Sequence, residues 1–586
     1  MISLLASLAF ATSGFDATTP SATFTGAETW DAEETVQLWS AVERHIDTNR
    51  TLFTAGEFNA STEWAESSAF APWIGTAFGT STPSGGTFLL HQGVHAGTAS
   101  GTPILFVPGA GDNASRGFVT MATKMDWAGR PVYAVTFAHP HGDVFEQAEI
   151  VADAIARVKV LTGATQVDLV SHSKGGIAVA VYLSHHAGAD WGSTSYESVG
   201  TPYRDDVRRS VFIATPLGGI DTAFRWPLGN VASLTADYAL APTSWRTYYP
   251  YGVGAPAWNT DLSEQDFFPD GGDLFPGQRQ ILARQDYPLP GSLPWLGAYS
   301  LQTDWYTSYE GGLGFYSDSD GIDAAVTAGG DLLEYLGAAG VDPGVEIFVL
   351  AGENPLMPNG VEDLLVGFFG ETWIDLATAG TDAWADLLAD AVGDGLLGVG
   401  VTRDEVQGLA TGDLILGEIS GPSDGLVFVS SSTASEALLA RGATVQETYV
   451  ANLSHLDLLY ASPITGQLLV DAAVADPVED GWMAAVGERY IEADTLGWVE
   501  RVLADEPVDT GGDADTDTDS DTDTDTDADT DTDTDADDTG AAADTGTPDA
   551  EDDDTGCGGC ASGSGGGGAL VAALALVLAI GRRRAE

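Results

Sequence analysis

One stretch of this sequence constrains the fold more than any other: a strand that runs into a serine-centred turn and then into a helix. The apolar run Val167–Val170 is followed by Ser-His-Ser-Lys-Gly-Gly and then by the apolar stretch Ile177–Leu183. A sharp strand-to-helix turn needs small residues two before and two after its centre, because backbones approach closely there. Ser171 and Gly175 hold these positions around Ser173. The pattern predicts a nucleophile at Ser173; the alternative is a serine-rich turn without chemistry.

Similar apolar runs recur along the chain and alternate with helical stretches. The further predicted strands are Ile104–Val107, Val132–Phe137, Val211–Ala214, Val345–Leu350 and Val445–Val450. A helix is expected from Asp143, with Glu146 completing a capping box, to Gly163. Another helix is expected around Ala32–Ile46. Short apolar strands alternating with helices predict an α/β fold with a mostly parallel, doubly wound sheet.

Two stretches interrupt this alternation. Asp221–Gly340 is rich in Trp, Tyr, Phe and Pro, whereas Asn354–Ile419 carries helix-like runs. Both follow the carboxyl ends of predicted strands, where open α/β sheets place their ligands. We therefore expect the insertions at 221–340 and 354–419 to form cap or lid elements. Ordinary insertions packed on the surface are the alternative for each.

Five short pieces between residues 104 and 460 carry a family resemblance. In chain order they read ILFVPGAGDNAS, VDLVSHSKGG, VFIATPLGGID, SDGLVFVSSS and LSHLDLLYA. Together they resemble the oxyanion loop, elbow, following strand, acid loop and histidine loop of the α/β-hydrolase fold, and within it bacterial lipases and esterases. The resemblance implies that the backbone N–H groups of Ala110 and Lys174 bind an oxyanion. The chain departs from the family pattern at Pro108-Gly109, where His-Gly is usual, and at Ser171, where glycine is usual.

The order of the family's triad, serine then acid then histidine, narrows the choice among nine histidines. Only His185, His186 and His455 follow Ser173. The first two lie 12 and 13 residues along the helix, which places them about 18–20 Å from the turn. His455 follows a strand-like run, as a base on a loop after a strand should, and is the predicted base.

The acid that orients His455 has two candidates. Asp424 lies 31 residues before the histidine, in the segment Ser-Asp-Gly-Leu-Val. Glu353 directly follows the strand Val345–Leu350, where the acid can also lie. The flanking residues favour Asp424, and Glu353 remains the competitor.

The predicted chemistry is acyl transfer without a cofactor. His455 would take the proton of Ser173, which attacks an ester carbonyl, and water would then cleave the acyl-enzyme. We expect a carboxylic-ester hydrolase acting on lipids. Alternatives are a polyester depolymerase, because Gly109–Ala114 resembles the oxyanion loop of some polyhydroxyalkanoate depolymerases, an acyltransferase with the same triad, and a non-catalytic surface binding protein on this scaffold.

Charge and cysteine content exclude several other functions. The chain has 87 acidic and 22 basic side chains, a formal charge of −65, so nucleic acid is excluded as a partner by repulsion from phosphates. The two cysteines, Cys557 and Cys560, lie near the C-terminus, which leaves residues 16–505 without a disulfide or a cysteine-based metal site. The run Asp318–Asp323 resembles part of a calcium loop but lacks the spacing and the closing Glu, so no metal is predicted.

The two ends of the chain predict export. Residues 1–15 form an apolar run with Ala9-Phe10-Ala11 as a cleavage site, although no basic residue precedes it; an apolar helix turn is the alternative. Residues 506–556 are an Asp/Thr-rich segment that repels itself and predicts a disordered stalk. Residues 557–586 combine the cysteines, a 12-residue apolar segment and three arginines, and resemble the MYXO-CTERM-type sorting tags of myxobacterial surface proteins.

That resemblance implies export, processing near the cysteines and attachment to a membrane through the C-terminal segment. A plain tail anchor is the alternative, although 12 apolar residues fall short of the roughly 20 that span a bilayer. The expected organisation is one catalytic domain, 16–505, with its two insertions, followed by the stalk and the tag.

Overall fold

The computed structural model describes the body of the chain. The described residues are 19–25, 39–54, 77–185, 196, 201–221, 276–285, 326–358, 413–415 and 421–505, apart from 51, 53, 328, 355 and 476–480. The predicted signal peptide, stalk and tag, the calcium-like run 318–323 and most of both predicted insertions lie outside these residues. No helix in the described ranges is both long enough and apolar enough to cross a bilayer.

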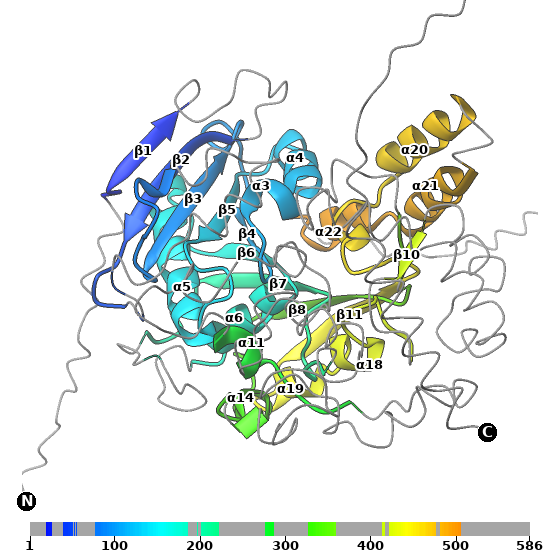
Figure 1. Ribbon diagram of the computed structural model, residues 1–586. Helices are drawn as coiled ribbons and strands as arrows, with labels where there is room; N and C mark the ends of the chain where they lie inside the picture. The colour runs from blue at the N-terminus through cyan, green and yellow to red at the C-terminus, as the bar shows by residue number, and fades with distance from the viewer. Residues whose placement is uncertain are drawn as a thin grey trace, which may run out of the picture.

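A nine-stranded sheet forms the centre of the molecule (Figure 1), in the order β1-β2-β3-β5-β4-β6-β7-β8-β11. The six strands from β5 to β11 pair in parallel, and β1, β2 and β3 extend the sheet with antiparallel pairs. Their bounds are β1 (Ala22–Thr25), β2 (Trp39–Ile46), β3 (Thr87–Gly93), β4 (Ile104–Val107), β5 (Val132–Phe137), β6 (Val167–His172), β7 (Val207–Ile213), β8 (Glu346–Gly352) and β11 (Thr444–Ala451).

The strand order places helices on both faces of this sheet. In the sheet, β5 lies on one side of β4 and β6 lies on the other. The connection from β4 to β5 and the connection from β5 to β6 therefore run in opposite directions across the sheet. Because parallel connections are right-handed, α4 (Val119–Trp127) and α5 (Val144–Thr162) must cover opposite faces. α6 (Lys174–Leu183) packs beside α5, and α22 (Thr495–Val502) packs beside α4 (Figure 1). The predicted α/β-hydrolase fold with a mostly parallel, doubly wound sheet is confirmed.

The remaining helices and a small second sheet lie around this core. They are α3 (Ala114–Gly117), α11 (Pro276–Gln280), α14 (Leu332–Ala339), α18 (Val429–Ser432), α19 (Glu436–Leu439), the 3₁₀ turn η6 (Asp457–Leu459), α20 (Pro463–Ala475) and α21 (Gly481–Ala493). α11 and α14 belong to the first insertion. In the second, β9 (Leu356–Pro358) pairs antiparallel with β10 (Asp413–Ile415), so its two ends lie side by side. Whether the insertions form a cap stays a prediction.

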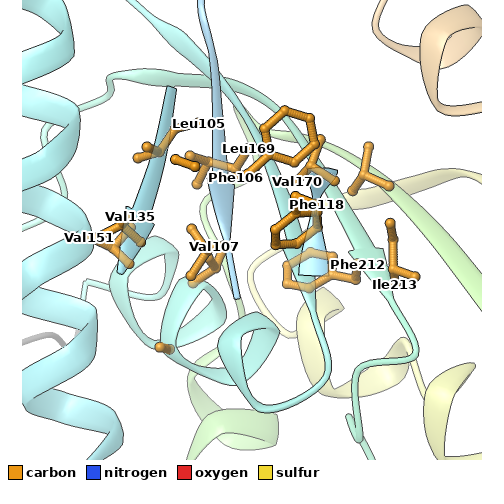
Figure 2. Packing of buried hydrophobic residues seen from close by; sticks show 14 of the residues in the cluster. Leu105, Phe106, Val107, Phe118, Val135, Val151, Leu169, Val170, Phe212 and Ile213 are labelled. Atoms are coloured by element: carbon orange, nitrogen blue, oxygen red, sulfur yellow. The ribbon is translucent and has the colours of Figure 1, made fainter. Parts of the chain in front are cut away.

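The core explains why the central strands could be predicted from the sequence. Side chains of β4, β6 and β7 pack around Phe118, the residue that directly precedes α4 (Figure 2). The rings of Phe106 and Phe118 lie 4.9 Å apart, centroid to centroid. Every residue of β4, β5 and β6 is buried, because helices cover both faces of the sheet. Strands buried in this way are continuous apolar runs, and the bounds of β4 and β5 agree with the prediction.

The helix expected around Ala32–Ile46 is wrong over the residues that the structure describes. Trp39–Ile46 is the strand β2, which pairs antiparallel with β3 on one side and with β1 on the other. Pairing on both edges satisfies the hydrogen-bonding groups of the β2 backbone. The buried side chains of Trp39 and Val42 pack into the core. These long-range contacts override a local pattern that suits a helix.

Helix α5 begins and ends as predicted, but its first-turn glutamate has a different role. Asp143 accepts a hydrogen bond from the N–H of Phe145 at 2.8 Å, and Gly163 ends the helix at φ 73°. Glu146, expected in a capping box, is buried and its Oε1 accepts from the N–H of Leu52 at 2.7 Å. Burial raises the pKa of Glu146 well above its ordinary value, and nearby Asp143 and Glu149 raise it further.

We expect Glu146→Gln to make the protein less sensitive to alkaline pH. The raised pKa means that the folded state holds the Glu146 proton more tightly than the unfolded chain does. The stabilising contribution is complete below the unfolded pKa and is lost as pH rises through the folded pKa. Glutamine keeps the acceptor for Leu52 and does not titrate. The thermal midpoint should fall more between pH 5 and pH 9 for the native protein than for the variant; equal falls would contradict the account.

Candidate active site

Ser173 lies at the turn between β6 and α6, in a backbone conformation that non-glycine residues avoid. Its φ is 53° and its ψ is −132°. Such a conformation costs about 1–3 kcal/mol and persists only where the surroundings enforce it. The hydroxyl of Ser171 donates to the carbonyl of Val211 at 3.1 Å and ties the preceding strand to β7. The strand, turn and helix therefore follow one another as the sequence indicates.

Gly175 allows α6 to begin close against β4. A Cβ at this position would lie 2.2 Å from the carbonyl oxygen of Pro108 and 2.9 Å from that of Val107. Both neighbours are backbone atoms of a central strand and its loop, so they cannot move aside easily. The requirement for a small residue two after the serine thus has a direct steric cause.

We expect Gly175→Ala to destabilise the protein by about 1–3 kcal/mol or more, because the methyl group forces the elbow and β4 apart. Urea unfolding followed by tryptophan fluorescence measures this loss. Gly97→Ala is a matched control, because a Cβ at the exposed Gly97 meets no atom within 4 Å. An unchanged unfolding midpoint for Gly175→Ala would contradict the steric account.

The structure brings His455 and Asp424 together in the interior. His455 Nδ1 lies 2.8 Å from Asp424 Oδ2, and the His455 N–H donates to the Asp424 carbonyl at 2.9 Å. The other carboxylate oxygen, Oδ1, accepts from the N–H groups of Leu426 and Val427 at 2.9 and 2.7 Å. Both oxygens of Asp424 are therefore held by the chain. With Nδ1–H bonded to a carboxylate, the neutral His455 ring has its lone pair on Nε2.

Glu353, the competing acid, occupies a different place. It directly follows β8 and is half-buried, and its N–H donates to the carbonyl of Ala451 at 2.9 Å. The carboxylate on Nδ1 of His455 is that of Asp424. The geometry thus favours Asp424 as the partner of His455.

The loop after β4 packs against the serine turn. A Cβ on Gly109 would lie 3.0 Å from the Cβ of Ser173, so the next residue, Ala110, lies near Ser173, and it is buried. Lys174, on the other side of Ser173, begins α6. Its ammonium donates to Gln147 Oε1 and lies 3.5 Å from the carbonyl oxygen of Pro140. The two predicted oxyanion residues therefore flank Ser173, with the Lys174 side chain turned toward α5.

Part of the first insertion is anchored beside this turn, which sequence reasoning did not find. The N–H of Gly277, in α11, donates to the carbonyl of His141 at 3.2 Å. Gln280 accepts from the Val144 N–H at 2.8 Å and donates to Asp143 at 2.9 Å. A Cβ on Gly277 would lie 2.2 Å from Cε of Lys174. These partners are about 136 residues apart in the chain, so no local pattern could signal them.

His172 is a further residue of the site that the sequence did not single out. It ends β6, and its Nε2 lies 3.1 Å from the carbonyl oxygen of His455. Its ring also lies 4.6 Å from that of His455, centroid to centroid. The described residues contain no group of three or more His, Cys, Asp or Glu side chains arranged to hold a metal ion. Ser173 and His455 are 5% and 2% exposed, so each is nearly closed off from solvent in this structure.

Comparisons with known proteins give distant structural neighbours. No family model and no curated protein sequence matches the chain. The mature form of a Bacillus licheniformis lipase has 16% identity over 64% of this chain and 91% of its own, with a TM-score of 0.26. A thermostable carboxyl esterase from Bacillus coagulans has 12% identity over 70% and 96%, with a TM-score of 0.26.

The Staphylococcus hyicus lipase has 12% identity over 66% of this chain and 94% of its own, with a TM-score of 0.27. Against the propeptide form of the Bacillus licheniformis lipase, the chain spans half of that protein's length. The strand order of the chain itself, with its helices on both faces of the sheet, supports the fold.

Proposed function

We propose that the protein is a serine hydrolase that cleaves carboxylic esters through an acyl-enzyme. The observation that carries this proposal is the buried Asp424–His455 pair, whose histidine contacts His172, the residue before the serine of a strained strand-to-helix turn. A carboxylate-bound histidine is the base that activates a hydroxyl nucleophile, and a strained strand-to-helix turn presents that hydroxyl. A protein without catalytic demand has no need to combine them.

The mechanism follows from the roles of these groups. His455 Nε2 takes the proton as Ser173 Oγ attacks the ester carbonyl, and Asp424 stabilises the imidazolium that forms. The N–H groups of Ala110 and Lys174 bind the oxyanion, aided by the dipole of α6. His455 then gives the proton to the leaving alcohol. Water repeats the sequence on the acyl-enzyme and releases the acid.

We propose lipids as the substrate class. The support is compositional: the first insertion is rich in aromatic residues, which suit an acyl chain, and its described helix α11 is anchored beside Ser173. Export and attachment to the cell surface are proposed from the two ends of the chain, with the stalk setting the catalytic domain off from the membrane. Protease treatment of intact cells should remove the surface activity; retention of the activity would argue against this placement.

A substrate panel tests the proposed activity. Native protein is assayed on p-nitrophenyl esters from C2 to C16, on a triglyceride emulsion and on a polyester film, with Ser173→Ala as the blank. We expect hydrolysis of the longer esters and of the triglyceride. Turnover confined to the polyester film would replace the lipid proposal with a depolymerase. No turnover above the blank on any ester would contradict the function itself.

A further inference from the structure

His172 contacts three parts of the site that have to be aligned. It precedes Ser173 directly at the end of β6. Its Nε2 lies 3.1 Å from the carbonyl oxygen of His455, and its ring is tilted by 51° to the His455 ring at 4.6 Å. A Cβ on Gly109, in the oxyanion loop, would lie 3.2 Å from Nδ1 of His172. The imidazole thus lies between the base and the oxyanion loop.

The surroundings fix the protonation of this ring. Because Nε2 faces a carbonyl oxygen, it must carry the proton and donate. Nδ1 is buried, with no hydrogen-bond partner in the part of the chain that the structure describes. A second proton on Nδ1 would therefore be buried without an acceptor. Burial, followed by the charge of nearby His455, lowers the pKa of His172 well below its ordinary value.

The neutrality of His172 has a consequence for its neighbour. The two imidazoles are in contact, so a positive charge on one opposes a positive charge on the other. Since His172 stays neutral, His455 is the ring of the pair that can become positive during acyl transfer. Its main chain is meanwhile held at a fixed distance from the strand that carries the nucleophile.

We propose that His172 is a positioning residue, which holds the His455 loop in register with Ser173 through the Nε2–H hydrogen bond. This inference rests on the proposed ester hydrolysis. A misplacement of about 1 Å at a reacting group can cost about 10²-fold in rate. The loss should appear in kcat and not in KM, because His172 is buried and its contacts are with protein atoms.

Three variants of His172 distinguish the contribution of its hydrogen bond from the contribution of its side-chain volume. His172→Gln keeps an N–H donor at about the reach of Nε2, whereas His172→Phe and His172→Met keep the volume and lose the donor. On p-nitrophenyl butyrate, we expect kcat to fall about 10²-fold for Phe and Met with KM within about twofold. The Gln variant should recover most of the loss. Thermal midpoints are measured alongside for all three.

Each outcome decides the proposal. A kcat near the native value in a folded Phe or Met variant would overturn it, as would a Gln variant as slow as Phe at an equal thermal midpoint. Failure of both donor-less variants to fold, with Gln folded, would make His172 structural and overturn it too. Ser173→Ala runs in the same assay: activity retained there refutes the proposed function, whereas activity lost there with kcat intact in His172→Phe refutes only this inference.

Discussion

Ser173→Ala should lower kcat for p-nitrophenyl esters by about 10⁴- to 10⁶-fold, because no other group can form the acyl-enzyme. The residual rate would come from the oxyanion donors and from substrate binding alone. The fold should survive, since alanine loses only the hydroxyl and meets the same backbone strain at φ 53°. Steady-state kinetics with matched circular dichroism spectra and thermal midpoints measure the effect.

Ser184→Ala is the matched control for this exchange. Ser184 is buried at the other end of α6, where its hydroxyl donates to the carbonyl of Val181 at 2.8 Å. Losing that bond costs about 1 kcal/mol of stability and leaves the turn around Ser173 untouched. Native kcat in Ser173→Ala, or an equal loss in both variants, would remove Ser173 from the mechanism.

Asp424→Asn should lower kcat by about 10⁴-fold with little change in structure. Asparagine keeps an oxygen for the N–H groups of Leu426 and Val427, so the loop is retained. The amide NH₂ that then faces His455 can donate but cannot accept, so the ring is held in the wrong tautomer. The loss therefore reports on the His455 contact and not on folding. The comparison is made on kcat at the pH optimum of the native protein.

Glu353→Gln separates the two acids that the sequence left open. Glu353 is half-buried at the end of β8, away from the Nδ1 contact, so its variant should stay within a few-fold of the native kcat. The reverse ranking, with Glu353→Gln inactive and Asp424→Asn active, would assign the acid to Glu353. Equal and small effects would show that His455 works without a carboxylate.

The parts of the fold that were predictable are those governed by local physics. β4 and β5 are continuous apolar runs because helices cover both faces of the sheet, and α5 ends at a glycine that adopts the left-handed conformation. β2 was predicted as a helix because its strand state depends on pairing with β3, about 50 residues further on. Pairing between strands so far apart in the chain cannot be predicted from the local sequence pattern.

The residues of the site likewise fall into those that the local sequence predicts and those that depend on tertiary contacts. Ser173 and His455 could be proposed from a turn motif and from chain order, which are one-dimensional features. The choice between Asp424 and Glu353 depends on where a side chain points, and that is set by the turn in which Leu426 and Val427 bind Asp424 Oδ1. His172 was missed because the elbow pattern leaves that position unspecified. Its contact with His455 joins residues 283 apart in the chain.

The central claim is that Ser173 is the nucleophile of an ester hydrolase, and covalent trapping tests it most directly. Native protein is incubated with a p-nitrophenyl alkylphosphonate, the released p-nitrophenolate is quantified, and the modified peptide is sequenced by mass spectrometry. We predict about one equivalent of p-nitrophenolate per chain, one phosphonyl group located on Ser173, and no labelling of Ser173→Ala. A label on another residue, or an active esterase with an unmodified Ser173, would contradict the claim.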